Sequence, residues 1–399
     1  MPALFDALRV AAEKLQPELV SLRRHLHAHP ELSWQEVETS SSIRRKLEEN
    51  GIQGFVRLAK TGFFVDIKGG KPGPTIAYRA DMDALAIQDA KKAEYRSQVE
   101  GVAHMCGHDV HTTIATGVAL LLHENRDKLK GTVRVFWQPA EETTPSGAPE
   151  MIKDGLLEGV DAVYGIHIDP TIDSGQIGIR YGADTASFNA FTITVKAPGT
   201  THSARPHTGH DTIWIAHQIA QNLYQLATRL TDARSPLVLS IGMFHGGDAL
   251  NIIPDVVTFG GTVRASGEVE LTTIREHIEK LVKQFSELYG VKIDAEILHG
   301  APAVINNGKL VDFVKHSLAE TVGLAAIEDR EQSMGAEDFG YYTEVVPSVF
   351  MRIGSRNSDE TAHPLHSNLF DIDESVLGPA AAVQTYLLIE HLKQNPLQE

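Results

Sequence analysis

The feature that most constrains the fold is a series of short apolar runs in the first half of the chain. These runs are rich in β-branched and aromatic residues, and they lie at residues 62–69, 75–80, 132–140 and 162–168. Runs of this length and composition are typical of strands buried in a sheet. Helical apolar spacing is found at residues 5–26, 36–50 and 109–126. Strands that alternate with helices predict an α/β fold with a mixed, largely parallel sheet and helices on both faces.

The pattern changes at about residue 186. From there the predicted elements follow the order β-α-β-β-α-β, which is typical of a compact ferredoxin-like unit. After residue 299 the α/β character returns, and the chain closes with a helix at 376–394. The sequence therefore predicts a catalytic domain formed by residues 1–185 and 300–399, with a lid or dimerisation domain at 186–299 inserted into it.

Composition narrows the classes of function. The net charge of −16 disfavours nucleic-acid binding, because an acidic surface repels phosphate. No apolar stretch approaches the length of a membrane span, and charged residues occupy the start of the chain where a signal peptide would be apolar. The only cysteine, Cys106, excludes an intrachain disulfide and favours a reducing cytoplasm. The 19 histidines indicate a metal.

Side chains that suit metal binding or proton transfer stand at the ends of the predicted strands or shortly after them. They are Asp83 in RADMDAL, Cys106 and His108 in HMCGHDVH, Glu141 and Glu142 in QPAEE, His167 in GIH, and His366 in HPLHSNLF. Taken singly, each has an ordinary alternative: a helix-capping aspartate, a buried structural cysteine, a solvated pair of carboxylates or a core histidine.

Taken together, the motifs favour a metal centre. One cysteine, three histidines and one glutamate are too many ligands for a single tetrahedral ion, and they suit two ions that share a bridging thiolate. His366 is separated from His167 by the whole inserted domain, so the chain must leave the site and return to it. Of the adjacent carboxylates Glu141 and Glu142, one can bind a cation while the other stays free to take a proton from water.

These motifs resemble the amidohydrolase branch of the dimetal aminoacylase and carboxypeptidase-G-like metallopeptidase family, which includes hippurate, N-acyl-amino-acid and indoleacetyl-amino-acid hydrolases. The resemblance covers nearly the whole chain, through RRHLHAHPELSWQE (23–36), RADMDAL, HMCGHDVH, QPAEE, GIH, MGAEDF (334–339) and HSNLF. Other branches carry an H-x-D motif where this chain has Asp81-Met82-Asp83. The Cys106 and His108 pair looks like the compensation for the missing histidine.

The resemblance implies two divalent metal ions per chain, with Zn²⁺ expected and Mn²⁺, Co²⁺ or Ni²⁺ as alternatives. Cys106 would bridge the ions. His108 and His167 would complete one metal site, and Glu142 and His366 would complete the other.

The resemblance also implies the reaction, which is cleavage of the amide bond of an N-acyl-L-amino acid to a carboxylic acid and a free amino acid. A hydroxide that bridges the metals would attack the carbonyl, with Glu141 as general base. Asp83 would lie behind the ligands and orient them.

In the inserted domain, Thr200-Thr201-His202-Ser203 resembles the G-G-H-A segment of the family, although the two threonines depart from its glycines. In the family, the histidine of this segment reaches the scissile carbonyl across a dimer interface. The match of His202 to that histidine therefore implies a homodimer, or a dimer of dimers, through this domain. Asn251 and Arg264 match positions that hold the carboxylate of the substrate.

Three other interpretations remain. The chain could be a dipeptidase, carboxypeptidase or carbamoylase of the same architecture. It could be a metal-holding binding protein without turnover, although Glu141 is not needed to bind metal. A structural zinc protein is disfavoured, because structural ligands usually cluster locally and these are spread over most of the chain.

Overall fold

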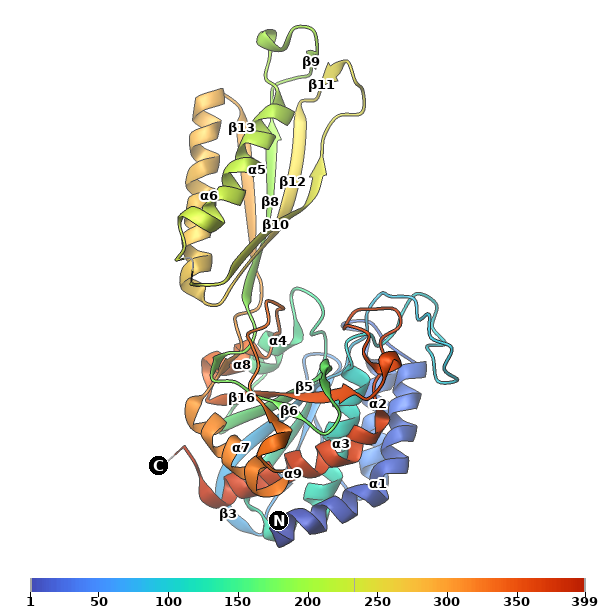
Figure 1. Ribbon diagram of the computed structural model, residues 1–399. Coiled ribbons are helices and arrows are strands. Elements are labelled where there is room, and N and C mark those ends of the chain that lie inside the picture. Colours follow the sequence, from blue (N-terminus) through green and yellow to red (C-terminus); the bar gives the residue numbers. More distant parts are fainter. Residues whose placement is uncertain (1, 233, 398–399) are drawn as a thin grey trace. The chain divides into compact units, whose positions relative to one another are not determined.

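The computed structural model describes residues 2–232 and 234–397, and it divides into two compact units (Figure 1). Unit 1 comprises Met1–Asp184, Ile305–Glu331 and Asp338–Glu399, and unit 2 comprises Thr185–Val304 and Gln332–Glu337. Each unit has its own cluster of buried hydrophobic side chains. Among the described residues, no helix is both long and apolar enough to cross a membrane.

Unit 1 is built on an eight-stranded sheet with the order β1-β2-β4-β3-β5-β16-β6-β15. Its strands are β1 (Val56–Leu58), β2 (Gly62–Lys68), β3 (Lys71–Asp81), β4 (Lys130–Gln138), β5 (Ala162–Asp173), β6 (Ile177–Gly178), β15 (Ile327–Glu328) and β16 (Ser348–Arg356). The four long central strands β4, β3, β5 and β16 are mutually parallel. A separate short ladder joins β7 (Gly182–Ala183) to β14 (Ile305–Asn306).

Helices cover both faces of this sheet. They are α1 (Ala3–Ala28), α2 (Val37–Glu49), α3 (His108–Glu124), α4 (Gly147–Lys153), α7 (Gly308–Thr321), α8 (Gly340–Val345) and α9 (Leu377–Gln394). The side chain of Trp137 in β4 lies in the core beneath α3 and donates to Thr112 O at 3.4 Å. The preceding residue of β4, Phe136, points to the other face and packs against Tyr342 of α8, with 5.3 Å between ring centroids. The predicted α/β class is thereby confirmed.

The parallel strands place the polar motifs at one edge of the sheet. Asp81 at the end of β3 lies opposite Gln138 at the end of β4. Arg79 of β3 pairs with Gly165 of β5, two residues before His167. Because β3 and β4 end level with each other, the segments that follow them meet beside His167 in the middle of β5, on the carboxyl-end side of the parallel strands, where α/β proteins usually keep their sites.

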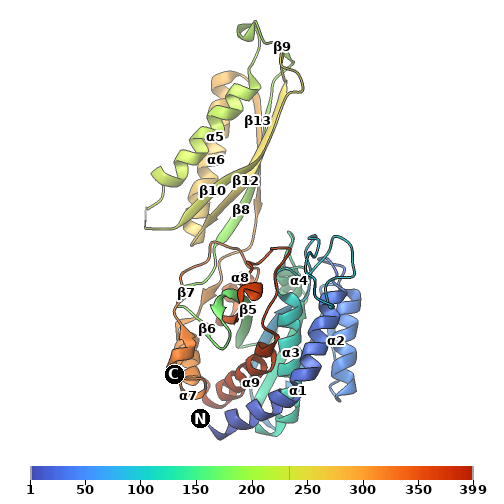
Figure 2. The same cartoon turned by 45° about the vertical axis from the view of Figure 1, so that its right-hand side comes forward.

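Unit 2 has a four-stranded antiparallel sheet of order β10-β12-β8-β13 with two helices on one face (Figure 2). Its main elements are β8 (Ser187–Lys196), α5 (Thr212–Arg229), β10 (Leu237–His245), β12 (Val256–Ala265), α6 (Glu268–Tyr289) and β13 (Lys292–His299). Asp211 caps the N-terminus of α5, where its side chain accepts the N–H of Trp214 at 2.9 Å. At one end of the unit, β9 (Thr201–His202) pairs with β11 (Ile252–Ile253).

Candidate metal centre

Cys106 lies just before α3, and His108 is the first residue of that helix. Between them stands Gly107, whose φ of 89° is a left-handed conformation that a side chain disfavours. This turn sends the chain into α3 with both neighbouring side chains buried.

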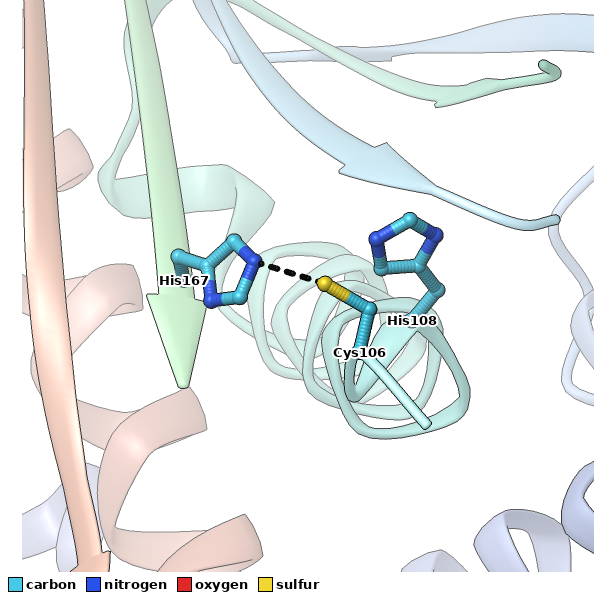
Figure 3. Close-up of side chains that lie close together, drawn as sticks. All are labelled: Cys106, His108 and His167. Atoms are coloured by element: carbon cyan, nitrogen blue, oxygen red, sulfur yellow. Dashed lines mark hydrogen bonds between the residues drawn. The ribbon is translucent and has the colours of Figure 1, made fainter. Parts of the chain in front are cut away.

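Two groups of candidate ligands share the sulfur of Cys106. In candidate site A, ligand atoms of Cys106, His108 and His167 all lie within 4.8 Å of one another. Figure 3 shows the ring of His167 pointing toward the thiol, with Nε2 at 3.4 Å from Sγ. In candidate site B, Cys106, Glu142 and His366 meet the same distance limit. A sulfur common to two ligand groups is the arrangement that a bridging thiolate requires.

His366 reaches candidate site B from a loop near the end of the chain. Its backbone N–H donates to Met105 O at 2.7 Å, which joins this loop to the segment before α3. The backbone of His366 is left-handed, with a φ of 64°. Its Nε2 lies 3.3 Å from Oε1 of Glu142.

The structure offers a direct test of whether these residues fit metal ions. Nε2 of His108 and Oε1 of Glu142 are shielded from solvent, and neither makes a hydrogen bond within the part of the chain that the structure describes. The two atoms are 3.8 Å apart. Buried polar atoms are normally paired, so an imidazole nitrogen and a carboxylate oxygen that lie near each other without partners fit a cation, which takes both groups as ligands.

The charges around the candidate ligands also favour a bound cation. Burial lowers the pKa of His108, but the charge of Asp81 and the hydrogen bond to Asp83 outweigh it and raise the pKa to about 10. Burial raises the pKa of Cys106 well above its ordinary value, and the charges of Glu142 and Glu141 add to that effect. Without a cation, therefore, the site holds excess negative charge and a neutral thiol, and a bound cation would favour the thiolate.

Hydrogen bonds orient the ligand rings. Nδ1 of His167 lies 2.7 Å from Ile168 O, a carbonyl that can only accept, so the proton sits on Nδ1 and the lone pair of Nε2 points at Cys106. Burial lowers the pKa of His167 well below its ordinary value, which keeps the ring neutral. Nδ1 of His108 lies 3.1 Å from Asp83 Oδ1, so its Nε2 faces the candidate ligand cluster.

Asp83 therefore lies where the sequence predicted an orienting residue. Its Oδ2 accepts the backbone N–H of Glu142 at 2.9 Å and the hydroxyl of Ser33 at 2.7 Å. One carboxylate thus links a histidine of site A to the backbone of a ligand of site B.

A third group, formed by Asp81, His108 and His111, also meets the distance limit for a metal site. Both nitrogens of His111 are already used, because Nδ1 bonds Asp81 Oδ1 at 2.6 Å and Nε2 accepts the N–H of Ile168 at 2.8 Å. Asp81 also pairs with Arg79 at 2.5 Å. His111 thus supports β5 at the residue after His167 and has no nitrogen left for a metal.

Glu141 stands beside the two sites. Its Oε2 is 4.0 Å from Nε2 of His108, and its Oε1 accepts the backbone N–H of Asp338 at 3.4 Å. The carboxylate of Asp338 is itself held by Arg79 at 2.9 Å and by Gln138 at 2.7 Å. The strand ends that carry the candidate ligands therefore also fix the position of the candidate base.

In unit 2, His202 and Asn251 lie together at the β9–β11 ladder. His202 pairs with Ile252, and Asn251 O accepts the N–H of Ser203 at 3.1 Å. Both side chains are exposed. Nδ1 of His202 accepts the N–H of Ala204 at 3.1 Å, so a neutral ring carries its proton on Nε2 and presents a donor to solvent.

Arg264 lies at the other end of the same unit. It stands near the end of β12, where its Nη1 donates to Met334 O at 3.0 Å and its guanidinium lies over the ring of Phe188. From Val256 to Arg264 the strand rises eight residues, about 26 Å. Within unit 2, Arg264 is thus not brought together with His202 and Asn251.

Several residues around the site carried no role in the sequence analysis. They are Ser33, Glu36, Arg79, Asp81, His111, Gln138 and Asp338. Most of them lie inside the same sequence motifs as the candidate ligands, and membership of a motif is the only sequence signal that points to them. Their partners are distant in sequence, and only the fold identifies them.

Comparison with known proteins agrees with this site. Residues 77–390 match Peptidase family M20/M25/M40. The α/β fold and the clustered Cys, His and Glu side chains fit a metal-dependent hydrolase. The chain belongs to the M20/M25/M40 peptidase family, which confirms the resemblance seen in the sequence.

Three similar proteins illustrate the range of the family. N-acetyl-L-cysteine deacetylase of Bacillus subtilis is 37% identical over 95% of this chain and 88% of its own length. Thermostable carboxypeptidase 2 of Saccharolobus solfataricus is 34% identical over 97% of this chain and 98% of its own. The crystal structure of the Bacillus subtilis YXEP protein, described as a dinuclear metal-binding peptidase, superimposes with a TM-score of 0.83 at 34% identity, covering 96% of this chain and 99% of that one.

Proposed function

We propose that this protein is a metal-dependent amidohydrolase that cleaves N-acyl-L-amino acids into a carboxylic acid and a free amino acid. The observation that carries the proposal is the pairing of sites A and B through the sulfur of Cys106, with the carboxylate of Glu141 close to His108 of site A and Glu142 of site B. Metal binding alone does not require this second carboxylate, whereas hydrolysis does. The deacetylase relative supports an N-acyl substrate.

The residues divide the chemistry between them. Divalent ions held by Cys106, His108, His167, Glu142 and His366 would activate water and polarise the amide carbonyl. Glu141 takes the proton of the attacking water and delivers it to the leaving amine, so that a poor leaving group departs neutral. The N–H of Asp338 holds the carboxylate of Glu141 for both transfers.

His202 and the substrate-binding residues complete the proposal. The exposed Nε2–H of His202 would donate to the carbonyl oxygen as negative charge develops there. Asn251 and Arg264 would bind the carboxylate of the amino acid, which fixes the amide in position for attack.

The geometry of unit 2 supports a homodimer. Arg264 is about 26 Å along β12 from Val256, whereas His202 and Asn251 belong to the β9–β11 ladder that precedes Val256, so the three residues are too far apart to contact one small substrate. A site that uses all three residues must take them from two copies of the chain. Such a site would be absent from a monomer.

Unit 2 also offers a surface for that contact. β10 is an edge strand of its sheet, and the apolar side chains of Val238 and Phe244 on it are exposed. Trp214 and Tyr224 of the adjacent α5 are about half exposed. Exposed edges with apolar side chains favour pairing with another strand, and we place the dimer contact here.

The test of the reaction is release of amino acid from a panel of N-acyl amino acids, using chelated protein with and without added Zn²⁺, Mn²⁺, Co²⁺ or Ni²⁺. Metal-dependent release supports the proposal, and the ranking of acyl groups defines the substrate. Release only from dipeptides or longer peptides would favour the second candidate, a carboxypeptidase, which the Saccharolobus relative supports. Binding of metal without turnover on either panel would leave a binding protein.

The dimer is tested by mixing two inactive variants, Glu141→Gln and His202→Ala. If His202 acts in its partner's site, a mixed dimer contains one intact site, and an equal mixture regains about one quarter of the wild-type sites. If His202 acts within its own chain, mixing restores nothing. A control mixture of His202→Ala with Asn251→Ala should stay inactive, because both changes remove the same contribution.

We also propose the cytoplasm as the location of the protein. A thiol that bridges two ions must stay reduced, and Cys106 is the only cysteine in the chain.

A further inference from the structure

Glu36 is a buried carboxylate at the end of the N-terminal motif, and its role is not explained by the ligand set. Its side chain is 0% exposed. Oε1 accepts the N–H of Ala140 at 2.8 Å and the N–H of Trp34 at 3.0 Å, and Oε2 accepts the hydroxyl of Thr61 at 2.8 Å. Three donors therefore satisfy this carboxylate, and one of them is the backbone directly before Glu141.

The backbone at Ala140 needs support. Its φ of 53° is left-handed, which costs a residue with a side chain conformational free energy. On its other side, Ala140 O accepts the N–H of Gly147 at 2.9 Å, which closes the loop 140–147. The direction in which the chain leaves Ala140 sets where Glu141 points.

The residues next to Glu36 hold the same region. The indole N–H of Trp34 donates to Pro145 O at 3.2 Å, at the far side of the loop. The hydroxyl of Ser33 donates to Asp83 Oδ2, the oxygen that also accepts the N–H of Glu142. Residues 33–36 therefore make three separate contacts, two with the loop 140–147 and one with Asp83, which accepts an N–H of that loop.

A buried carboxylate at this position has a cost. Burial disfavours its charged form, and the nearby charge of Asp83 adds to the penalty. Those costs are offset only where the oxygens receive hydrogen bonds, and Oε1 receives two, from the backbone N–H groups of Ala140 and Trp34. A carboxylate at this position therefore acts by stabilising the geometry of the backbone beside Glu141.

We propose that Glu36 is a positioning residue for Glu141, acting by holding the left-handed peptide of Ala140. Glu36 touches neither the candidate ligands nor the reacting atoms, so it works entirely through the backbone. The inference rests on the proposed role of Glu141 as the base.

Three variants separate this role from general stability. Glu36→Ala removes the acceptor from Ala140. Glu36→Gln keeps an oxygen for the N–H of Ala140 and turns its amide to the hydroxyl of Thr61, which can accept. Glu31→Ala is the matched control, because Glu31 also accepts two backbone N–H groups, those of Glu38 and Thr39, but at the start of α2.

The first measurement is hydrogen exchange of peptides that cover residues 139–147 in the metal-loaded protein. Glu36→Ala should speed exchange there about tenfold or more, whereas Glu36→Gln and Glu31→Ala should match the wild type. The second measurement is kinetic. Glu36→Ala should lower kcat about 10- to 100-fold with KM and metal content unchanged, and Glu36→Gln should largely restore it.

The proposal fails if Glu36→Ala leaves exchange at 139–147 unchanged, or if Glu36→Gln is as impaired as Glu36→Ala. It also fails if Glu31→Ala lowers kcat equally. If Glu36→Ala does not fold, Thr61→Val gives the second test, because it removes one of the donors to Glu36. This variant should speed exchange and lower kcat in the same way but by less. Unchanged exchange and unchanged kcat in Thr61→Val would contradict the proposal. Inactivity of the wild type on every substrate would reject the proposed function and still leave the exchange result to decide on Glu36.

Discussion

Asp83 joins His108 to the backbone of Glu142, two candidate ligands that belong to different metal sites. One oxygen faces Nδ1 of His108 at 3.1 Å, and the other accepts the N–H of Glu142 at 2.9 Å. The two candidate sites are therefore linked through a residue outside both ligand groups, in addition to the shared sulfur of Cys106.

Asp83→Asn should weaken metal binding at both sites. An asparagine can accept from His108 only by turning its amide group toward the N–H of Glu142, where two donors then meet. We expect a loss of about 10- to 100-fold in metal affinity, measured by competition with a chelator. Ser33→Ala, which removes only one donor to Asp83, should give a clearly smaller loss, and an unchanged affinity in Asp83→Asn would contradict the assignment.

Glu141→Gln and Glu142→Gln should fail in different ways although the residues are adjacent. Glu141→Gln should keep two ions per chain and lose about 10²- to 10⁴-fold in kcat, because the amide cannot take a proton. Glu142→Gln should instead lose metal from site B, because a neutral amide is a poorer ligand. Metal analysis and turnover of the same samples check both, and full activity of Glu141→Gln would reject it as the base.

Cys106→Ser should lower the metal content below two ions per chain. The hydroxyl retains its proton and is a weak ligand for zinc-like ions, and the change removes an atom common to both sites. Metal content after dialysis is the measurement. Met105→Leu is the control, because it alters a buried neighbour and leaves the sulfur of Cys106 in place. Two tightly held ions in Cys106→Ser would exclude a bridging role.

The stability of the metal-free protein should fall on acidification because of His391. This histidine is buried beside Tyr164, and burial lowers its pKa to about 4 from an ordinary value of 6.5. Between these values the unfolded chain binds a proton that the folded chain does not, so stability is lost as the pH falls from about 6.5 toward 4. The contribution amounts to about 2 kcal/mol between pH 7 and pH 5.

Urea unfolding of chelated protein at the two pH values measures this loss. His391→Gln keeps an acceptor for the hydroxyl of Tyr164 but cannot titrate, so its stability should depend less on pH. Exposed His316→Gln should follow the wild type. Equal pH dependence in wild type and His391→Gln would show that other groups cause the loss.

The local elements of unit 1 could be predicted from the sequence, because periodicity and composition act over a few residues. The run at 132–140 forms β4 (Lys130–Gln138), and the helical pattern at 109–126 forms α3 (His108–Glu124). The order of strands could not be predicted. β16 lies between β5 and β6, far from its neighbours in sequence, and only long-range pairing sets that place.

The residues of the candidate site likewise divide into those that the sequence predicts and those that it does not. Thiol, imidazole and carboxylate at strand ends carry a chemical signal that is visible in the motifs of Cys106 and Glu142. The residues that hold them carry none, since nothing near Glu36 indicates that its partner is Ala140, 104 residues away. The reacting groups can therefore be identified from the sequence, whereas the groups that position them become visible only in the fold.

The central place of β16 also bears on how the protein is made. A growing chain that has passed residue 168 already contains every candidate ligand of site A, but β5, which carries His167, still lacks β16, the second of its two parallel neighbours. Both β16 and His366 emerge only after the whole of unit 2 has been synthesised. Pairing of the last long strand and arrival of the last ligand are therefore nearly simultaneous, and on this assignment a nascent or truncated chain cannot hold the second ion.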